Sequence, residues 1–191
     1  TIVQHIEASL VDYTRAIKLR PDVATYYAAR SYLQPDTAAK LADITHALDL
    51  NPESAEYYAF RGDYHVDLGN HEAAIADYSQ ALALQPRNVT YREQQTKQYQ
   101  QMGEYKKALY GMFYLVAFGS PRLKAHYLYR SATLLSEAAH QEQALAVLAT
   151  AHTEYIEGIK NIRTKLIREI ALLFVQLGDP AAALACYDAH V

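Results

Sequence analysis

Residues 68–86 read LGNHEAAIADYSQALALQP, and this stretch decides the fold. Ala74, Tyr78 and Ala81 recur at helical spacing, so all three fall on one face of a helix. Small residues let a second helix approach closely, and a large residue fills the space beside the crossing. Pro86 ends the run because proline cannot continue the helical hydrogen bonding. The stretch therefore predicts a helix that packs tightly against a neighbour.

The same pattern returns along the chain at a fixed period. Gly69 and Gly103 are 34 residues apart, and so are Ala74 and Ala108. Residues 36–52, DTAAKLADITHALDLNP, align with the opening stretch and also end in proline. Self-similarity at a period between about 20 and 50 residues is typical of repeat architectures, so we expect an array of helix pairs.

The period and pattern resemble the tetratricopeptide repeat, a helix–turn–helix unit. Its aromatic, small and proline positions match, in residues 55–88, Tyr58, Gly62, His65, Ala74, Tyr78, Ala81 and Pro86. The resemblance implies an all-α fold, a right-handed superhelical solenoid of antiparallel helix pairs. We expect a single array over 1–191, part of a longer chain, with one leading helix and five pairs: 1–20, then 22–53, 55–88, 89–122, 123–158 and 161–191.

Three features depart from the family pattern. The pair that begins at residue 22 is short between its helices and has Lys40 where a small residue belongs. The second helix of the 123–158 pair has no terminal proline and should run on, so that the next repeat starts near Thr164. Side chains that can cap helix N-termini precede most predicted helices. These expected N-caps are Asp22, Asp36, Ser54, Asn88, Ser120 and Asp179.

Composition excludes several classes of protein. The net charge of −3 gives no general attraction to nucleic acid, so we expect no nucleic-acid partner. The longest apolar run is too short to cross a bilayer, so we expect no membrane insertion. The single cysteine excludes an intrachain disulfide framework and is compatible with a reducing compartment. We expect a soluble protein, slightly favour the cytoplasm, and leave the compartment open.

The resemblance also suggests where a partner binds. In this family the first helix of each pair lines a concave groove, and projecting the groove-facing positions onto this chain gives Glu56, Asp63, Asp67, Gln94, Lys97, Gln101, His126, Tyr129, Arg130, Lys165 and Arg168. This set is acidic in its first part and mostly basic in its second. We therefore expect a charge-polarised groove, with an acidic segment of the partner near the basic residues. The alternative is that these residues are ordinary solvated helix faces.

Tyrosine and histidine are frequent, with 17 and 8 residues. Most tyrosines fall on helix-packing positions, which predicts core roles for Tyr13, Tyr27, Tyr58, Tyr78, Tyr99, Tyr105 and Tyr187. Tyr32 and Tyr129 are candidates for exposed contacts. No histidine has metal-ligand spacing, and His65 is predicted to be a hydrogen-bonded core residue. We predict no catalytic residue, no metal and no cofactor.

The glutamine-rich segment 91–105 is unusually polar for a packed helix. It indicates either a poorly packed repeat or side chains that serve a partner, and the sequence leaves both open.

The leading function is a non-enzymatic scaffold that binds a peptide, helix or flexible segment of another protein. The alternatives are a structural segment that self-associates, or meets further repeats, through its end faces, and a recruiting or regulatory domain of a larger enzyme.

Overall fold

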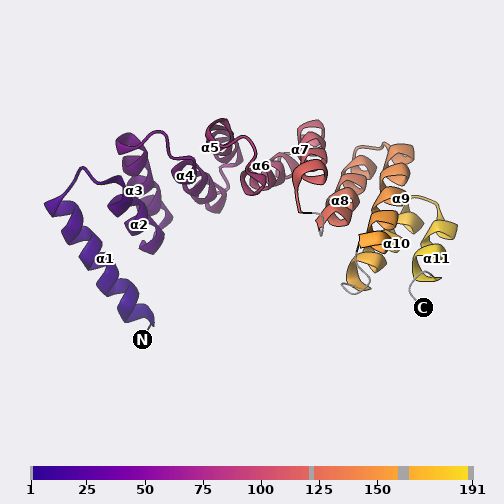
Figure 1. The fold of residues 1–191 in the computed structure, drawn as a ribbon, viewed down its shortest axis with the longest axis horizontal. Coiled ribbons are helices and arrows are strands. Elements are labelled where there is room, and N and C mark those ends of the chain that lie inside the picture. The colour runs from indigo at the N-terminus through magenta and orange to yellow at the C-terminus, as the bar shows by residue number, and fades with distance from the viewer. Residues whose placement is uncertain (1, 121–122, 159–163, 189–191) are drawn as a thin grey trace. The chain divides into compact units, whose positions relative to one another are not determined.

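The structure, a computed structural model, describes residues 2–120, 123–158 and 164–188, without the side chains of Val3, 154–158, 164–168 and 186–188. Within these ranges the regular structure is helical (Figure 1). The helices are α1 (Ile2–Leu19), α2 (Ala24–Leu33), α3 (Thr37–Leu50), α4 (Ala55–Asp67), α5 (His71–Leu84), α6 (Val89–Gln101), α7 (Tyr105–Phe118), α8 (Lys124–Glu137), α9 (Gln141–Gly158), α10 (Thr164–Gln176) and α11 (Pro180–Asp188). They form two compact units, unit 1 (Thr1–Met102) and unit 2 (Gly103–Val191).

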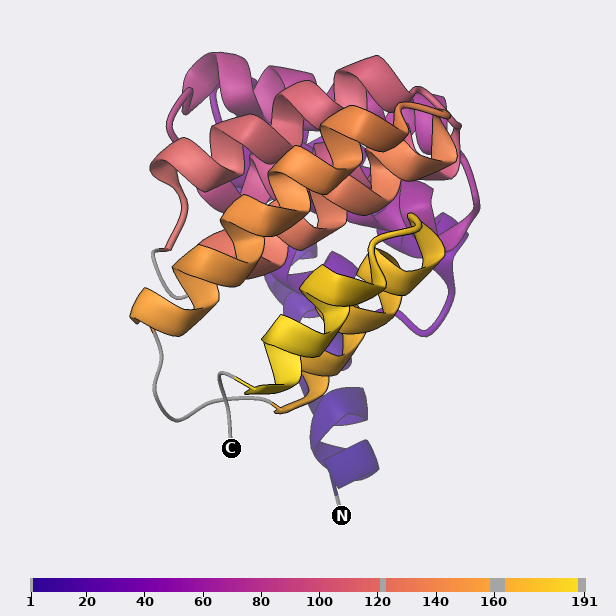
Figure 2. The ribbon, with the colours of Figure 1, turned by 90° about the vertical axis from the view of Figure 1, so that its right-hand side faces the viewer.

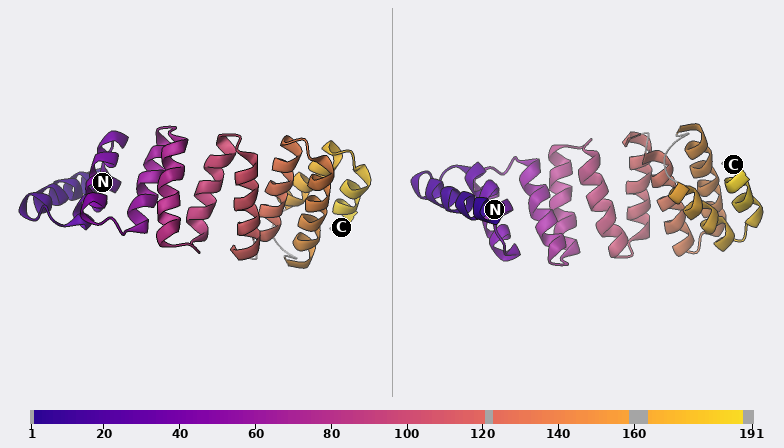
Figure 3. Two further views of the ribbon diagram at one scale, coloured as in Figure 1. Left: turned by 90° about the horizontal axis from the view of Figure 1, so that it is seen from above. Right: turned by 90° about the horizontal axis from the view of Figure 1, so that it is seen from below.

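Neighbouring helices pack as hairpins within each unit. In unit 1, α2 packs on α3 and α4 on α5 (Figure 3). The first hairpin contacts the second through α3 and α4, and α5 contacts α6. In unit 2, α8 packs on α9 and α10 on α11, which lie side by side in Figures 1 and 2. The predicted all-α fold of antiparallel helix pairs is confirmed. That both units belong to one continuous array stays a prediction.

The hairpin of α4 and α5 has the close crossing that its sequence predicts. Ala74 and Ala81 have no solvent-exposed surface, and Tyr78 is 1% exposed. Gly62 on α4 lies against the Tyr78 ring, and a Cβ atom added to this glycine would stand 2.9 Å from Tyr78 Cε1. The small residues therefore let the two helices approach, and Tyr78 fills the space beside the crossing.

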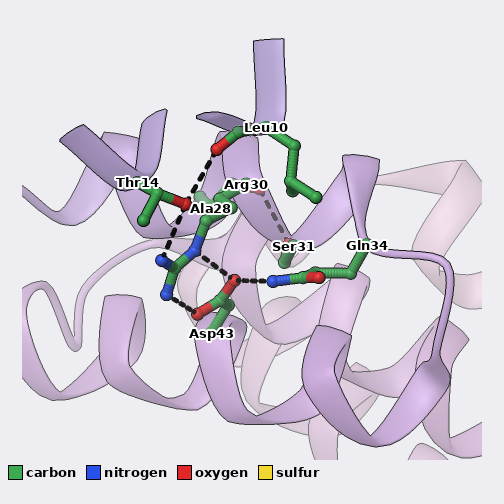
Figure 4. A network of polar contacts seen from close by, with 7 residues as sticks. All are labelled: Leu10, Thr14, Ala28, Arg30, Ser31, Gln34 and Asp43. Atoms are coloured by element: carbon green, nitrogen blue, oxygen red, sulfur yellow. Dashed lines mark hydrogen bonds and ion pairs between the residues drawn. The ribbon is translucent and has the colours of Figure 1, made fainter. Parts of the chain in front are cut away.

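In unit 1, each of two successive hairpins has an arginine–aspartate pair that joins its two helices. Arg30 on α2 donates to both carboxylate oxygens of Asp43 on α3, at 2.8 and 2.6 Å (Figure 4). Gln34 also donates to Asp43, at 3.1 Å, and Arg30 reaches Thr14 of α1 at 3.4 Å. In the next hairpin Arg61 on α4 donates to Asp77 on α5, with Nη2 2.7 Å from Oδ1. Both aspartates are buried, so each carboxylate needs the positive charge of its arginine to offset the loss of hydration.

Most of the predicted helix caps are present. The side chains of Asp36, Ser54 and Asn88 accept from a backbone N–H three residues ahead, as Asp179 does at the start of α11. The prediction for Asp22 is wrong. Its carboxylate instead pairs with Arg20, at 3.0 and 3.1 Å, and Val23 takes the N-cap position of α2. The prediction for Ser120 is also wrong, because Leu123 takes the N-cap position of α8.

The interior of unit 2 is built from aliphatic and aromatic side chains. Leu128 and Leu135 of α8, Leu148 of α9, and Ile170 and Phe174 of α10 form one buried cluster. Helix α9 continues to Gly158 and α10 begins at Thr164, as the missing proline predicts. The longer helix therefore delays the next repeat without breaking the hairpin order.

The tyrosines divide differently from the prediction. Tyr27 and Tyr78 are buried and Tyr13, Tyr58 and Tyr99 are half-buried, whereas Tyr187 lies outside the described side chains. The core prediction for Tyr105 is wrong, because this residue is exposed at the first position of α7. Three other tyrosines, for which we made no core prediction, are buried: Tyr57, Tyr64 and Tyr127.

Candidate functional site

A groove with a volume of about 490 Å³ lies between α1, α2 and α4 of unit 1. Aromatic residues from all three helices line it: Tyr13 from α1, Tyr32 from α2, and Tyr57 and Phe60 from α4. We call it the aromatic groove. Its floor includes small residues of α2, which leave room above them: Ala28 and Ala29.

The aromatic side chains that line the groove differ in how deeply they are buried. Tyr57 is buried, and this burial raises the pKa of its phenol, with the charge of Glu56 acting in the same direction. Tyr32 is 76% exposed, as predicted for a contact residue. Phe60 is half-buried. A ring as exposed as Tyr32 contributes little to folding, so its apolar surface is available to another molecule.

Three acidic residues of α4 that we predicted to face a partner are exposed: Glu56, Asp63 and Asp67. Glu56 also lines the aromatic groove. The Tyr78 hydroxyl donates to Asp63 Oδ1 at 2.6 Å. Although part of the Asp63 side chain is open to solvent, desolvation raises the pKa of its carboxyl, and the hydrogen bond from Tyr78 only partly offsets this.

The predicted residues of α6 have mixed surroundings. Lys97 Nζ lies 3.8 Å from Glu93 Oε1, one helical turn away. Its positive charge offsets part of the rise in the pKa of Asp63. Gln94 is half-buried and Gln101 is exposed. Lys97 therefore lies within electrostatic reach of the acidic residues of α4, so the two charges act on the same part of unit 1.

Other glutamines of α6 pack inside unit 1. Gln95 is buried and donates to the Ser79 hydroxyl of α5 at 2.8 Å. Gln98 is also buried, with Oε1 2.9 Å from His71 Nδ1. Since both amides are hydrogen-bonded to α5, these two side chains hold a polar helix interface together and are not available to a partner.

The predicted site residues of unit 2 lie on α8 and α10. His126, Tyr129 and Arg130 of α8 are half-buried, whereas the side chains of Lys165 and Arg168 of α10 lie outside the described residues. The prediction of an exposed contact is wrong for Tyr129. Its ring packs against the apolar cluster of unit 2, and burial raises the pKa of its phenol.

A second hollow, with a volume of about 410 Å³, lies between α3 and α4 and has His46, Asp49, Arg61 and His65 in its walls. His65 is half-buried with Nε2 3.8 Å from Asp77 Oδ2, but its Nδ1 is buried without a hydrogen bond, so the prediction of a hydrogen-bonded histidine is wrong at this atom. Within the described ranges, no three His, Cys, Asp or Glu residues form a group that could hold a metal ion.

Sequence reasoning missed part of the aromatic groove. It placed Tyr13 in the core, yet this half-buried residue lines the groove together with Ser9. Tyr57 lines it as well, although no groove role was assigned to it. A pattern of repeat positions assigns groove roles to the first helix of each pair, so it has no position for a contribution from α1.

The tetratricopeptide repeat family model matches residues 55–88. No curated protein sequence matches the chain significantly. Among solved structures, MamA is similar over 84% of this chain and 90% of its own, with 14% identity and a TM-score of 0.74. YrrB, described as a TPR protein with an unusual peptide-binding site, is similar over 93% and 90%, with 16% identity and a TM-score of 0.68.

A chain from the structure of Naa15/Naa10 bound to HypK-THB is also similar, over 98% of this chain and 31% of its own, with 16% identity and a TM-score of 0.62. At such identities the likeness concerns the fold. None of the helices in the described ranges is both long and apolar enough to span a membrane. Residues 55–88 are thus a tetratricopeptide repeat, and the chain that contains them is a protein of the tetratricopeptide repeat fold.

Proposed function

We propose that this protein is a non-enzymatic scaffold that binds a peptide, helix or flexible segment of a partner protein. The observation that carries the proposal is the aromatic groove, where the exposed ring of Tyr32 faces a hollow of about 490 Å³. Exposed aromatic surface in a hollow is the kind of site at which a few anchor residues give most of the binding energy. The structural likeness to YrrB, whose description includes a peptide-binding site, supports the same function.

Charge is the second part of the proposal. The acidic residues of α4 receive the basic part of a partner segment, and the basic positions predicted in α6, α8 and α10 receive its acidic part. Lys97 is half-buried, as is Arg130, and both belong to this second set with Lys165 and Arg168. Arginine suits this role because its guanidinium pairs with a carboxylate through two hydrogen bonds.

Selection from a library of random peptides on the immobilised full chain tests the proposal. The test uses two tyrosine variants with the same chemical change. Tyr32→Ala removes the exposed ring of the aromatic groove, and Tyr110→Ala removes a ring of α7 that is 68% exposed and does not line the groove. Neither ring is buried, so both variants should fold, and circular dichroism checks this.

We expect peptides that bind the wild type and Tyr110→Ala but not Tyr32→Ala. We call these groove-dependent peptides. The proposal is wrong if no peptide is enriched, or if the enriched peptides bind both variants equally well.

Self-association is a second candidate function, because apolar side chains are exposed on outer helices. On α1, Ile2 is 81% exposed and Val11 is 66% exposed. On α11, Leu184 is also exposed. Sedimentation at increasing protein concentration tests this candidate. A rise in mass that Val11→Ser suppresses would support it, and a constant monomer mass would exclude it.

A further inference from the structure

We propose that the aromatic groove is specific for a cationic, apolar segment: a leucine or aromatic side chain enters the hollow, and a neighbouring arginine or lysine pairs with Glu56. This inference rests on the proposed function and adds the chemistry of the ligand. The groove itself belongs to unit 1, since Tyr13, Tyr32, Phe60 and Glu56 all lie on α1, α2 and α4.

The apolar half of the preference follows from the lining. Aromatic rings of α1, α2 and α4 surround a floor of alanines, and Leu33 adds a further aliphatic wall. A leucine or aromatic side chain placed there removes apolar surface of both molecules from water. A polar anchor would lose its hydration among these side chains without gaining matching hydrogen bonds. The hollow therefore selects an apolar anchor.

The cationic half follows from the single charge in the lining. Among the described residues that line the aromatic groove, Glu56 is the only charged one, and it is exposed. The arginines of the two neighbouring helices are already engaged, Arg30 with Asp43 and Arg61 with Asp77. A basic group of a ligand would thus meet a carboxylate for which the described residues of α2 and α4 provide no cation.

The surroundings of Glu56 strengthen this charge preference. Asp63 and Asp67 continue the acidic face about two and three turns further along α4. Residues 1–95 together carry 13 Asp and Glu against 8 Lys and Arg. An anionic segment would therefore be repelled from the groove, and so would a nucleic acid. A cation close to the exposed Tyr32 ring can also gain a cation–π contact.

The composition of the groove-dependent peptides tests the inference. We expect these peptides to carry a net positive charge and at least one leucine or aromatic residue, compared with the unselected library. A matched pair of variants then isolates the charge. Glu56→Gln and Glu72→Gln make the same change at exposed residues in the first turns of α4 and α5, but only Glu56 lines the groove.

Fluorescence anisotropy with the best groove-dependent peptide gives the expected sizes. Glu56→Gln should weaken binding about threefold, because an exposed ion pair contributes little. Glu72→Gln should leave the affinity unchanged. Glu56→Lys should weaken this peptide further and strengthen binding of a version in which each basic residue is replaced by glutamate.

The failures of the two proposals can be told apart. If groove-dependent peptides exist but are neutral or acidic, or if they bind Glu56→Gln as tightly as the wild type, the cationic preference is wrong and the proposed function stands. If no peptide depends on Tyr32, both are wrong. A nucleic acid that competes with the peptide for the groove would also overturn the preference.

Discussion

The two units reach the same arrangement of helix hairpins with different interiors. In unit 1 an ion pair joins the two helices within a hairpin, Arg30–Asp43 between α2 and α3 and Arg61–Asp77 between α4 and α5, beside an apolar cluster that includes Ile44 and Leu48. The interior of unit 2 is a cluster of leucine, isoleucine, alanine and phenylalanine side chains. The comparison shows that the helix pairs of this fold have apolar cores in both units and that buried ion pairs can be added to such a core.

This difference also concerns function. The ion pairs of unit 1 engage the arginines of α2 and α4, and Glu56 is the one charged residue in the described lining of the aromatic groove. The buried ion pairs of unit 1 therefore have a consequence at its surface, where the acidic character of the groove is preserved. The following variants change one unit at a time.

The largest effect is expected for Leu148→Ala in unit 2. Leu148 is completely buried, so truncation leaves a cavity and should lower the free energy of unfolding by about 3 kcal/mol. The control is Leu184→Ala, the same change at an exposed residue of α11. Hydrogen exchange measured by mass spectrometry should show the loss of protection in α8 and α9. Equal losses for both leucines would contradict an apolar interior in unit 2.

A somewhat smaller effect is expected for Asp77→Ala in unit 1. The change leaves the partly buried Arg61 without its carboxylate and should cost about 2 kcal/mol. Asp12→Ala, at an exposed aspartate of α1, serves as the control and should be nearly neutral. Urea unfolding of both variants measures this. A loss for Asp77→Ala no larger than that for Asp12→Ala would mean that the pair does not stabilise unit 1.

Matched turns provide a finer comparison. Gly69 in unit 1 has a φ angle of 72°, and Ala139 in unit 2 follows the first helix of its hairpin with a φ angle of 62°. Side chains disfavour this backbone region, so Gly69→Ala should destabilise by about 1 kcal/mol and Ala139→Gly should stabilise by about 0.5 kcal/mol. Thermal unfolding should show midpoints that move in opposite directions. Shifts in the same direction would contradict the shared turn geometry.

The smallest effect is expected for Asp63→Asn. The pKa of Asp63 is raised in the folded protein, so its contribution to stability is present below its unfolded pKa and is lost as the pH rises through the folded pKa. The variant should therefore gain on the wild type between about pH 3 and about pH 7. We expect a gain of about 0.3 kcal/mol, since solvent screens an exposed charge. Urea unfolding at both pH values measures it, and a pH-independent difference would contradict the shift.

Local features were predictable from the sequence, and features formed between helices were not. The caps Asp36, Ser54 and Asn88 were correct because an N-cap bonds within one turn. Asp22 was wrong because Arg20, two residues away, competes for its carboxylate. The partners of Arg30 and Arg61 lie 13 and 16 residues away, and only the packing of the hairpins brings them together.

The candidate site follows the same rule. The exposure of Tyr32 and of Glu56 could be predicted, because repeat positions determine which face of a helix is solvated. The contribution of Tyr13 could not, since it depends on how α1 lies against α2. Lys40 was noted as a departure from the family pattern, and its ammonium lies 5.4 Å from the centre of the Tyr64 ring. This cation–π contact helps a lysine fit where the family has a small residue.

The most direct test of the account is the affinity of a groove-dependent peptide for three forms of the full chain: the wild type, Tyr32→Ala and Tyr110→Ala. The two variants remove rings of similar exposure, 76% for Tyr32 and 68% for Tyr110, from different units. We predict that Tyr32→Ala weakens binding about tenfold or more, as loss of an aromatic anchor does, and that Tyr110→Ala leaves it unchanged. Equal affinity for all three forms would contradict the account, because the aromatic groove would then not be the binding site.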